Sequence, residues 1–428
     1  MGIVKPDEKV RMDYMLMREM ETYSYLKGFN YLPSYARNDV EFWRDYDHDT
    51  VERELGYAER LTFNCARVFL SYTVYRHDRE KFLRDVLDYV RTAEKHGISV
   101  MPVVWDSCFS EREPRIDADI NEWIPNPGPM YLGREHWDGE EAYCRDLIET
   151  LREEKGFLLW DIHNEPLMTE YFLSAPSEEK ERRRESIWEF VRHFCRFFRR
   201  EDGAHPVTVG VAFASEMETV AEECDVLSFH TYADTWDGLR DAYETALDTA
   251  KKYGKAVFCS ETGCPARANP YDIAIETANR AGVGYILWEL MIGRCFWYDR
   301  HGVVYPDGTV RDPSIVAALL GFFRKREDRV DYNINTEGAA ESACDRAEKW
   351  LHDPEGEYGK GMELLCILAN LVESGGLAPE CELPSAKYIA LMKNPDPAEL
   401  RRMMKIWVDL LRVDAERKRG KNYSVLTN

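Results

Sequence analysis

Eight short apolar runs alternate along the chain with longer segments that have the period of an amphipathic helix. Most of the runs lack polar residues at every second position, which is typical of strands in a parallel sheet covered on both faces. The runs are Lys27–Leu32, Ala66–Leu70, Ser99–Trp105, Phe157–His163, Pro206–Ala212, Val226–His230, Ala256–Ser260 and Val283–Trp288. The helical segments that follow them in turn are Asp49–Thr62, Asp78–His96, Gly139–Glu154, Ser177–Arg199, Ser215–Glu223, Asp237–Tyr253, Tyr271–Ala281 and Pro313–Arg326.

This alternation predicts an α/β protein. Eight strand–helix repeats within about 300 residues are the number found in a TIM (β/α)8 barrel, so residues 1–326 are expected to form one barrel domain. A doubly wound open sheet is the structural alternative, but no glycine-rich phosphate fingerprint follows the first run. From residue 327 to 428 only helical segments recur, separated by Pro and Gly, which predicts an all-helical C-terminal appendage.

Charge narrows the range of partners. The 428 residues include 56 Lys and Arg against 78 Asp and Glu, a net charge of −22. Such a surface repels nucleic acid and anionic lipid. We therefore expect neither a nucleic-acid nor a membrane partner, and a neutral substrate fits better than a polyanion.

The N-terminal residues, the lack of long apolar windows and the cysteines indicate the cellular compartment of the protein. The N-terminal residues 1–8 contain no apolar stretch of the kind that begins a signal peptide, and no window approaches the roughly 18 apolar residues of a membrane span. The eleven cysteines are scattered and odd in number, as is typical of reduced thiols. These features predict a cytoplasmic protein.

Two glutamates each close an apolar run. Glu165 ends the fourth run, in Asn164-Glu165-Pro166, and Glu261 ends the seventh. An ionised carboxylate at the exit of a buried strand is costly unless it is hydrogen-bonded or serves chemistry. In a barrel, both would reach the same mouth. Glycoside cleavage with retention uses two such carboxyl groups about 5–5.5 Å apart, so we expect Glu165 to stay protonated as the acid and Glu261 to be the ionised nucleophile.

Further motifs on other runs resemble the clan of retaining glycoside hydrolases that includes family 5, the cellulase family. The resemblance extends from about Gly28 to Arg326 and implies a role for each matching residue. Asn164-Glu165 matches the strand-four pair that holds the sugar 2-hydroxyl and carries the acid/base, and Glu261 matches the strand-seven nucleophile. The matching substrate-binding positions are His230 and Tyr232 of the strand-six His-x-Tyr pattern, Trp288 as the strand-eight platform, and Arg67 of strand two.

The third strand departs from this pattern. Many family 5 members have a histidine after strand three, whereas this chain has Trp105-Asp106, and both are candidates for contact with the sugar. The long connections Asp106–Asp138 and Glu289–Asp312 contain aromatic residues of the kind that stack on sugars, among them Trp123 and, in the second, Trp297 and Tyr298. Packing over the barrel rim is the alternative explanation for these aromatic residues.

Other chemistries have less support. The chain has no H-E-x-x-H motif and no G-x-S-x-G elbow. Cys259, Cys264 and Cys295 are explained better as small buried residues than as zinc ligands, so no metal and no cofactor are expected.

The resulting hypothesis is a retaining β-glycosidase that hydrolyses β-linked oligosaccharides or glycosides, with carbohydrate as its partner. Two alternatives remain open: a transglycosidase that uses the same two carboxylates, and an inert carbohydrate-binding barrel. The sequence also leaves open whether the helical appendage closes one end of the cleft or pairs two subunits of a homo-oligomer.

Overall fold

The computed structural model describes residues 23–108, 113–117, 123–295, 300–323, 334–354, 356–377 and 384–425. It divides the chain between Ala318 and Leu319 into two compact units, each considered by itself below. The sequence had placed this boundary a little later, between residues 326 and 327.

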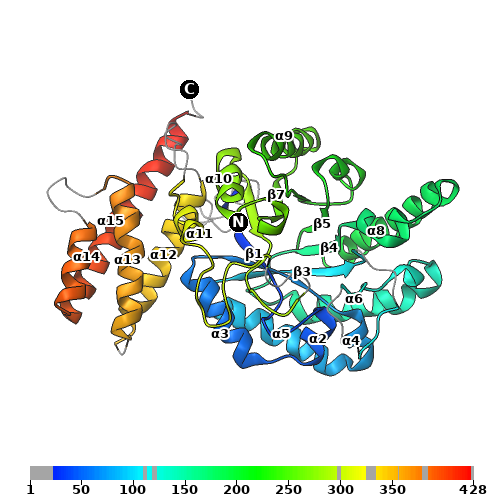
Figure 1. The fold of residues 1–428 in the computed structure, drawn as a ribbon, viewed down its shortest axis with the longest axis horizontal. Helices are drawn as coiled ribbons and strands as arrows, with labels where there is room; N and C mark the ends of the chain where they lie inside the picture. The colour runs from blue at the N-terminus through cyan, green and yellow to red at the C-terminus, as the bar shows by residue number, and fades with distance from the viewer. Residues whose placement is uncertain are drawn as a thin grey trace, which may run out of the picture. The chain divides into compact units, whose positions relative to one another are not determined.

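The first unit is built on a closed barrel of parallel strands. Each strand pairs with the next in the sequence, and β8 pairs with β1 to complete the ring. The helices surround the strands (Figure 1). This arrangement is a TIM barrel, which confirms the predicted α/β fold. The strands are β1 Lys27–Tyr31, β2 Cys65–Phe69, β3 Ser99–Asp106, β4 Trp160–Asn164, β5 Val207–Val211, β6 Leu227–His230, β7 Val257–Thr262 and β8 Gly284–Leu287.

Apolar side chains fill the end of the barrel where the strands begin. They come from the first three residues of the strands or from the residue just before them, and five of the eight apolar runs accordingly begin one to three residues before their strand. This floor consists of Leu26, Cys65, Met101, Leu159, Val226, Phe258 and Ile286, all at most 4 % exposed. The carboxyl ends of the strands are left for polar residues.

Helices cover the outside of the barrel with one apolar face each. In α5, for example, Phe82, Val86, Tyr89, Val90 and Ala93 are buried at helical spacing. The α-helices of this unit are α2 Asp39–Arg44, α3 His48–Arg60, α4 Tyr72–His77, α5 Arg79–Lys95, α6 Trp137–Leu151, α7 Glu170–Leu173, α8 Ser177–Glu201, α9 Trp236–Tyr253, α10 Tyr271–Ala281 and α11 Pro313–Leu319.

Two predicted helices differ in the structure. The segment expected at Ser215–Glu223 forms a 3-10 helix, η5 Ala214–Thr219, and ends where the β-branched pair Thr219-Val220 disfavours further helix. Helix α11 ends at Leu319 rather than at Arg326, because Gly321 has a φ of 84° and turns the chain out of the helical conformation.

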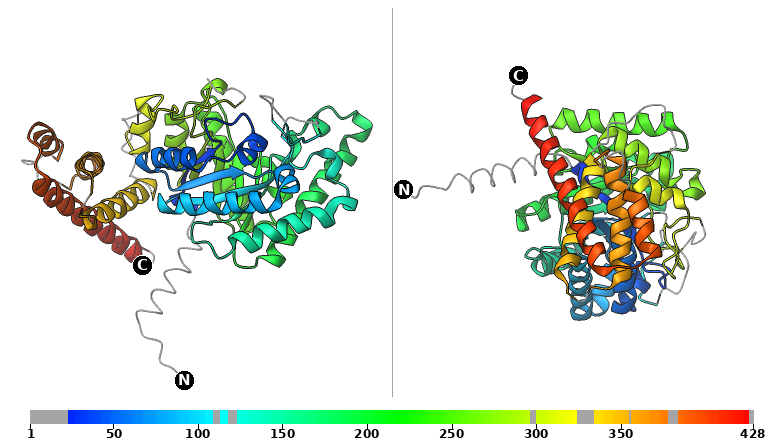
Figure 2. Two further views of the ribbon diagram at one scale, coloured as in Figure 1. Left: turned by 90° about the horizontal axis from the view of Figure 1, so that it is seen from below. Right: turned by 90° about the vertical axis from the view of Figure 1, so that its left-hand side faces the viewer.

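The second unit is entirely helical in its described part. Helices α13 and α15 pack on each other, α12 packs on both, and α14 packs on α13, as two further views show (Figure 2). Buried Trp350, Leu365, Met404 and Trp407 belong to a core of its own. The bounds are α12 Ile334–His352, α13 Tyr358–Ser374, α14 Pro384–Lys393 and α15 Pro397–Val425. A search of the described helices finds none with the length and apolar character to cross a membrane.

Candidate active site

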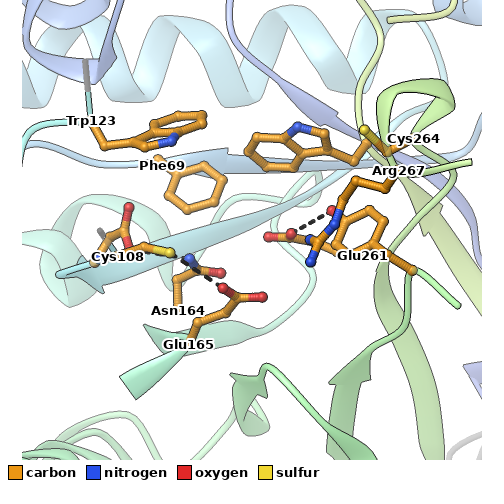
Figure 3. Close-up of a pocket in the computed structure, with 11 residues that line it drawn as sticks. Phe69, Cys108, Trp123, Asn164, Glu165, Glu261, Cys264 and Arg267 are labelled. Atoms are coloured by element: carbon orange, nitrogen blue, oxygen red, sulfur yellow. Dashed lines mark hydrogen bonds between the residues drawn. The ribbon is translucent and has the colours of Figure 1, made fainter. Parts of the chain in front are cut away.

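A pocket opens where the carboxyl ends of the strands meet (Figure 3). Its empty volume is about 670 Å³, part of it open to solvent. Both glutamates predicted from the sequence line this pocket and approach one another from β4 and β7. The other lining residues are Phe69, Asp106, Cys108, Trp123, Asn164, Tyr232, Cys264, Arg267 and Trp288.

Glu165 follows β4 directly and is fixed by an unusual backbone conformation. Its φ of 41° lies in the left-handed region, which residues other than glycine seldom adopt and which often marks functional sites. Its N–H donates to the carbonyl of Gly210 at 2.7 Å. Its carboxyl Oε1 lies 2.6 Å from His230 Nδ1, and its Oε2 accepts from the Cys108 thiol at 3.3 Å.

Glu261 lies within β7, and both of its carboxyl oxygens are held. Oε1 accepts from Arg67 Nη1 at 2.5 Å, and Oε2 accepts from the Tyr232 hydroxyl at 2.7 Å. His230 Nδ1 is 3.5 Å from the same Oε2. A carboxylate with charged and neutral donors on both oxygens is oriented and stabilised in its ionised form.

The two carboxyl groups are close together. One oxygen of Glu165, one oxygen of Glu261 and a ring nitrogen of His230 all lie within 4.8 Å of one another. Retaining glycosidases place their carboxyl groups about 5–5.5 Å apart, whereas inverting enzymes leave about 6.5–9.5 Å for a water. The close approach of these oxygens is nearer to the retaining arrangement than to the inverting one.

Arg67 holds several polar side chains at the base of this pocket in place. Its guanidinium, which is fully buried, donates to Asp161 at 2.8 Å, to Asn30 at 2.9 Å and to Asn164 at 2.8 Å, besides Glu261. Burial works against its charge, but the charges of Asp161 and Glu261 outweigh burial and raise the pKa of Arg67 above its ordinary value. One side chain of β2 thus links β1, β4 and β7.

The pKa values of the two glutamates differ from the sequence-based expectation. Burial raises the pKa of Glu261, and His230 and Arg67 oppose this effect only in part. Burial also acts on Glu165, but the hydrogen bond and charge of His230 outweigh it, so the pKa of Glu165 is lowered. The directions of these two shifts are thus opposite to those expected for an acid at Glu165 and a nucleophile at Glu261, because His230 lies closer to Glu165.

Asp106 and Asn164 extend the polar network across β3 and β4. Asn164 Nδ2 donates to Asp106 Oδ1 at 3.1 Å, and the Cys108 N–H donates to the same oxygen at 3.0 Å. Burial raises the pKa of Asp106 to about 7, and the charges of Glu165 and Glu261 add to the increase. Asp106 lines the pocket, and its contact with a sugar stays a prediction.

Aromatic residues form one wall of the pocket. Trp288, which directly follows β8, has its ring centroid 5.9 Å from that of Phe69 and 5.6 Å from that of Trp123. The predicted platform residue thus lies in the pocket, and Trp123 of the first long connection joins it. Trp297 and Tyr298 of the second connection fall outside the described residues.

Trp105 requires a correction. It is fully buried and packs against Tyr72, Tyr143, Phe190 and Phe194, on the outer side of β3. Because successive side chains of a strand point to opposite faces, Asp106 faces the barrel mouth and its neighbour Trp105 faces the helices. The placement of Trp105 among the sugar-binding residues was wrong.

Of the pocket residues that the sequence analysis missed, Phe69 ends β2 and Cys264 follows β7, and two others lie farther along their loops. Cys108 approaches Glu165 from the residues that follow β3, and Arg267 lies in the loop after β7 with its guanidinium carbon 4.5 Å from the ring centre of Tyr232. Both belong to loops, whose paths strand periodicity does not predict. The only available signal was their closeness in sequence to Asp106 and Glu261.

Two groups of side chains in the described part of the chain have the spacing of metal ligands. One is the trio of Glu165, His230 and Glu261, where Arg67 and Tyr232 already supply donors to the carboxylates. The other consists of Glu289, Cys295 and His301. In this second group the Cys295 thiol donates to Glu289 at 3.2 Å, and His301 Nδ1 lies 3.0 Å from the same carboxyl group, so the glutamate is stabilised by its neighbours.

Comparison with solved structures finds several barrels of similar fold. An exo-beta-1,4-mannosidase from Opitutaceae bacterium strain TAV5 is 16% identical with a TM-score of 0.53, over 75% of this chain and 67% of that one. A GH5_18 protein from Streptomyces cattleya in complex with Manb1-4GlcNAc is 13% identical with a TM-score of 0.53, over 82% and 92%. An endo-1,4-beta-mannanase from Rhizomucor miehei is 13% identical with a TM-score of 0.51, over 74% and 95%.

No protein-family model and no curated protein matches the sequence. At 13–16% identity, the property shared with the solved structures is the fold. The chain therefore resembles the glycoside hydrolases of family 5, and the part that it shares with them is the (β/α)8 barrel.

Proposed function

We propose that the protein is a retaining β-glycosidase that acts by double displacement. The observation that carries this proposal is the pair of carboxyl groups, Glu165 and Glu261, within 4.8 Å of each other at the barrel mouth. Glu261 is the nucleophile, because Arg67 and Tyr232 hold both of its oxygens. Glu165 is the acid and base, because its Oε1 lies 2.6 Å from His230 Nδ1, with which it can share a proton.

The reaction begins with attack of Glu261 on the anomeric carbon. The bond from that carbon to the bridging oxygen breaks, and the oxygen takes the proton shared by Glu165 Oε1 and His230 Nδ1 over 2.6 Å. Because Glu165 and His230 share this proton, the pair can supply it although the pKa of Glu165 is lowered. Glu165 then removes a proton from water, and the resulting hydroxide hydrolyses the glycosyl ester on Glu261.

The other residues of the site are assigned supporting roles. Asn164 and Asp106 bind hydroxyl groups of the sugar at the reaction centre, and Trp288 stacks under its ring. Among candidate sugars, β-mannosides are the first to test, because two solved structures of similar fold are named as a β-mannosidase and a β-mannanase. A cytoplasmic location would favour small imported oligosaccharides over polymers.

Covalent labelling tests the proposal. The protein is incubated with a panel of 2-deoxy-2-fluoro glycosyl fluorides, starting with the mannosyl donor, and its intact mass is measured before peptide mapping. We expect one glycosyl group on the peptide that contains Glu261, and none on a Glu261→Gln variant, whose amide is not a nucleophile. Labelling of any other residue, or of none across the panel, would contradict the assignment.

The role of Glu165 is tested by leaving-group dependence. A Glu165→Ala variant should form the glycosyl ester at nearly the normal rate from aryl glycosides with good leaving groups, which need little proton donation. Alkyl glycosides should slow by about 10²–10⁴-fold, the usual contribution of general acid catalysis. Equal slowing of both classes in this step would rule out Glu165 as the acid.

A further inference from the structure

Two further pockets adjoin the central one on opposite sides, one smaller and one larger than it. One has an empty volume of about 380 Å³ and lies over the ends of β1 and β2, with Asn30, Leu32 and Phe69 in its lining. The other, of about 1090 Å³, lies over β5, β6 and α9, with Phe213, Thr231 and Thr245 in its lining.

The position of the proposed acid gives the cleft a direction. Glu165 lines the central pocket and the large pocket but is not among the residues that line the small one. Because the acid must reach the departing oxygen, the leaving group extends into the large pocket. The sugar that is transferred to Glu261 then points toward the small pocket, past Trp288, which lines both.

Aromatic residues close the cleft on the side of the small pocket. Trp123 comes from the loop after β3 and Trp288 from the end of β8, and their ring centroids are 5.6 Å apart. In the barrel, β1 and β2 lie between β8 and β3. The contact therefore bridges the mouth over β1 and β2, where Phe69 packs edge-on against Trp288.

Asp39 supplies an unsatisfied hydrogen-bonding group in the small pocket. It begins α2, lines the pocket beside Asp106, and its buried Oδ2 has no hydrogen-bond partner among the described residues. Burial, and then the charge of Asp106, raise the pKa of Asp39 to about 8, although hydrogen bonding from the Ser71 side chain and from the backbone at Asp39 and Val40 to this carboxyl group acts in the opposite direction. A buried carboxyl oxygen without a partner is costly, and a sugar hydroxyl would satisfy it.

We infer, on the basis of the proposed function, that the enzyme is exo-acting: the wall of Trp123 and Trp288 admits one terminal sugar, and Asp39 binds a hydroxyl at its non-reducing end. In each cycle, the bond between the anomeric carbon of that sugar and the bridging oxygen breaks. The departing chain keeps the oxygen with the proton from Glu165, and water releases the sugar from Glu261 as a monosaccharide.

The test uses oligosaccharides of the sugar that labels Glu261, four units long and fluorescently tagged at the reducing end. The first tagged product of the full-length protein should be one unit shorter than the substrate. Blocking the terminal 4-hydroxyl with a methyl group should reduce cleavage at least tenfold. A mixture of tagged lengths from the start, or unchanged cleavage of the blocked substrate, would overturn the inference. Failure of the proposed function is separate, because Glu261 would then remain unlabelled by the fluoro donors.

Variants test whether Trp123 and Asp39 are the residues responsible for exo action. Trp123→Ala should open the wall and produce tagged fragments from internal cleavage, whereas Phe213→Ala, in the large pocket, should not. Asp39→Ala should lower kcat/KM about 2–10-fold, the value of a hydrogen bond between neutral groups, since the pKa of about 8 keeps this carboxyl group mostly protonated at neutral pH, and Asp39→Asn should restore part of it. Asp49→Ala is the matched control, since Asp49 is an exposed acidic residue in the first turn of α3. Exclusively terminal cleavage by the Trp123 variant, or equal losses for the Asp39 and Asp49 variants, would refute the assignment of these residues.

Discussion

The hydroxyl of Tyr232 has a measurable effect on acid–base behaviour, because it donates to the proposed nucleophile. Its hydrogen bond to Glu261 Oε2 favours the ionised carboxylate and lowers the pKa of Glu261, which burial otherwise raises. In Tyr232→Phe that pKa rises further, so the acidic limb of the kcat/KM profile should move to higher pH. We expect kcat/KM at neutral pH to fall about 10–100-fold. Tyr305→Phe, at a tyrosine that is 41 % exposed, should move neither limb, and an unshifted acidic limb in Tyr232→Phe would contradict the role of the hydroxyl.

Gly210 of β5 makes space for the buried polar network. A methyl group at this position would lie 2.8 Å from Arg67 Nη2, 3.0 Å from His230 Nε2 and 3.1 Å from Asp161 Oδ2. Gly210→Ala should therefore displace groups that orient both glutamates, with a loss of about 1–3 kcal/mol of stability, as is typical of overpacking. The free energy of unfolding measured in urea and kcat/KM should both decrease. Gly203→Ala, which meets no atom closer than 4.0 Å, should change neither; a fully active Gly210→Ala would show that the network tolerates the displacement.

Among the elements, the loop after β3 depends on one asparagine. Asn126 donates to the carbonyls of Leu70 and Val104 and accepts from the Tyr72 N–H, each at 2.8 Å. These bonds tie the loop that carries Trp123 to the ends of β2 and β3. Asn126→Ala leaves three buried backbone groups unpaired, so we expect a loss of about 2–4 kcal/mol and a higher KM.

Asn64 provides the control for this prediction at the other end of the barrel. It accepts from the Lys27 N–H at 2.8 Å and donates to the Tyr25 carbonyl at 2.9 Å, far from the pocket. Asn64→Ala should lower the free energy of unfolding in urea but leave KM unchanged. If both variants raise KM equally, the loop has no special role in substrate binding.

The same elements explain what the sequence could predict. The strands were found to within three residues at either end because buried parallel strands are continuous apolar runs. Glu165 and Glu261 were noticed because each closes such a run, whereas Arg67 and Trp288 were assigned from the resemblance to family 5. Cys108 and Arg267 were not found, since loop paths depend on long-range contacts. One example is Asn269, whose side chain accepts from the Gly263 N–H at 2.7 Å and donates to the Ala233 carbonyl at 2.8 Å. No local sequence pattern predicts such a long-range contact.

In the whole molecule, the barrel and the helical unit have separate cores. All described pocket residues belong to the first unit, whereas the second has a core of its own that includes Trp350, Leu365 and Trp407. Units with independent cores can unfold independently. Calorimetry should therefore resolve two transitions, and covalent glycosylation of Glu261 should raise the Tm of one. A single transition that shifts as a whole would show that the units unfold together.

Ring closure also sets an order of events during synthesis. Asn30 of β1 bonds to the carbonyl of Leu287 in β8, and 257 positions separate them. At about 5–20 residues per second, the ribosome needs roughly 13–50 s to make the last strand after the first. Throughout this interval the nascent sheet has two unpaired edges, which attract other strands. Chaperones that shield such edges have this period in which to act, before the helical unit is synthesised.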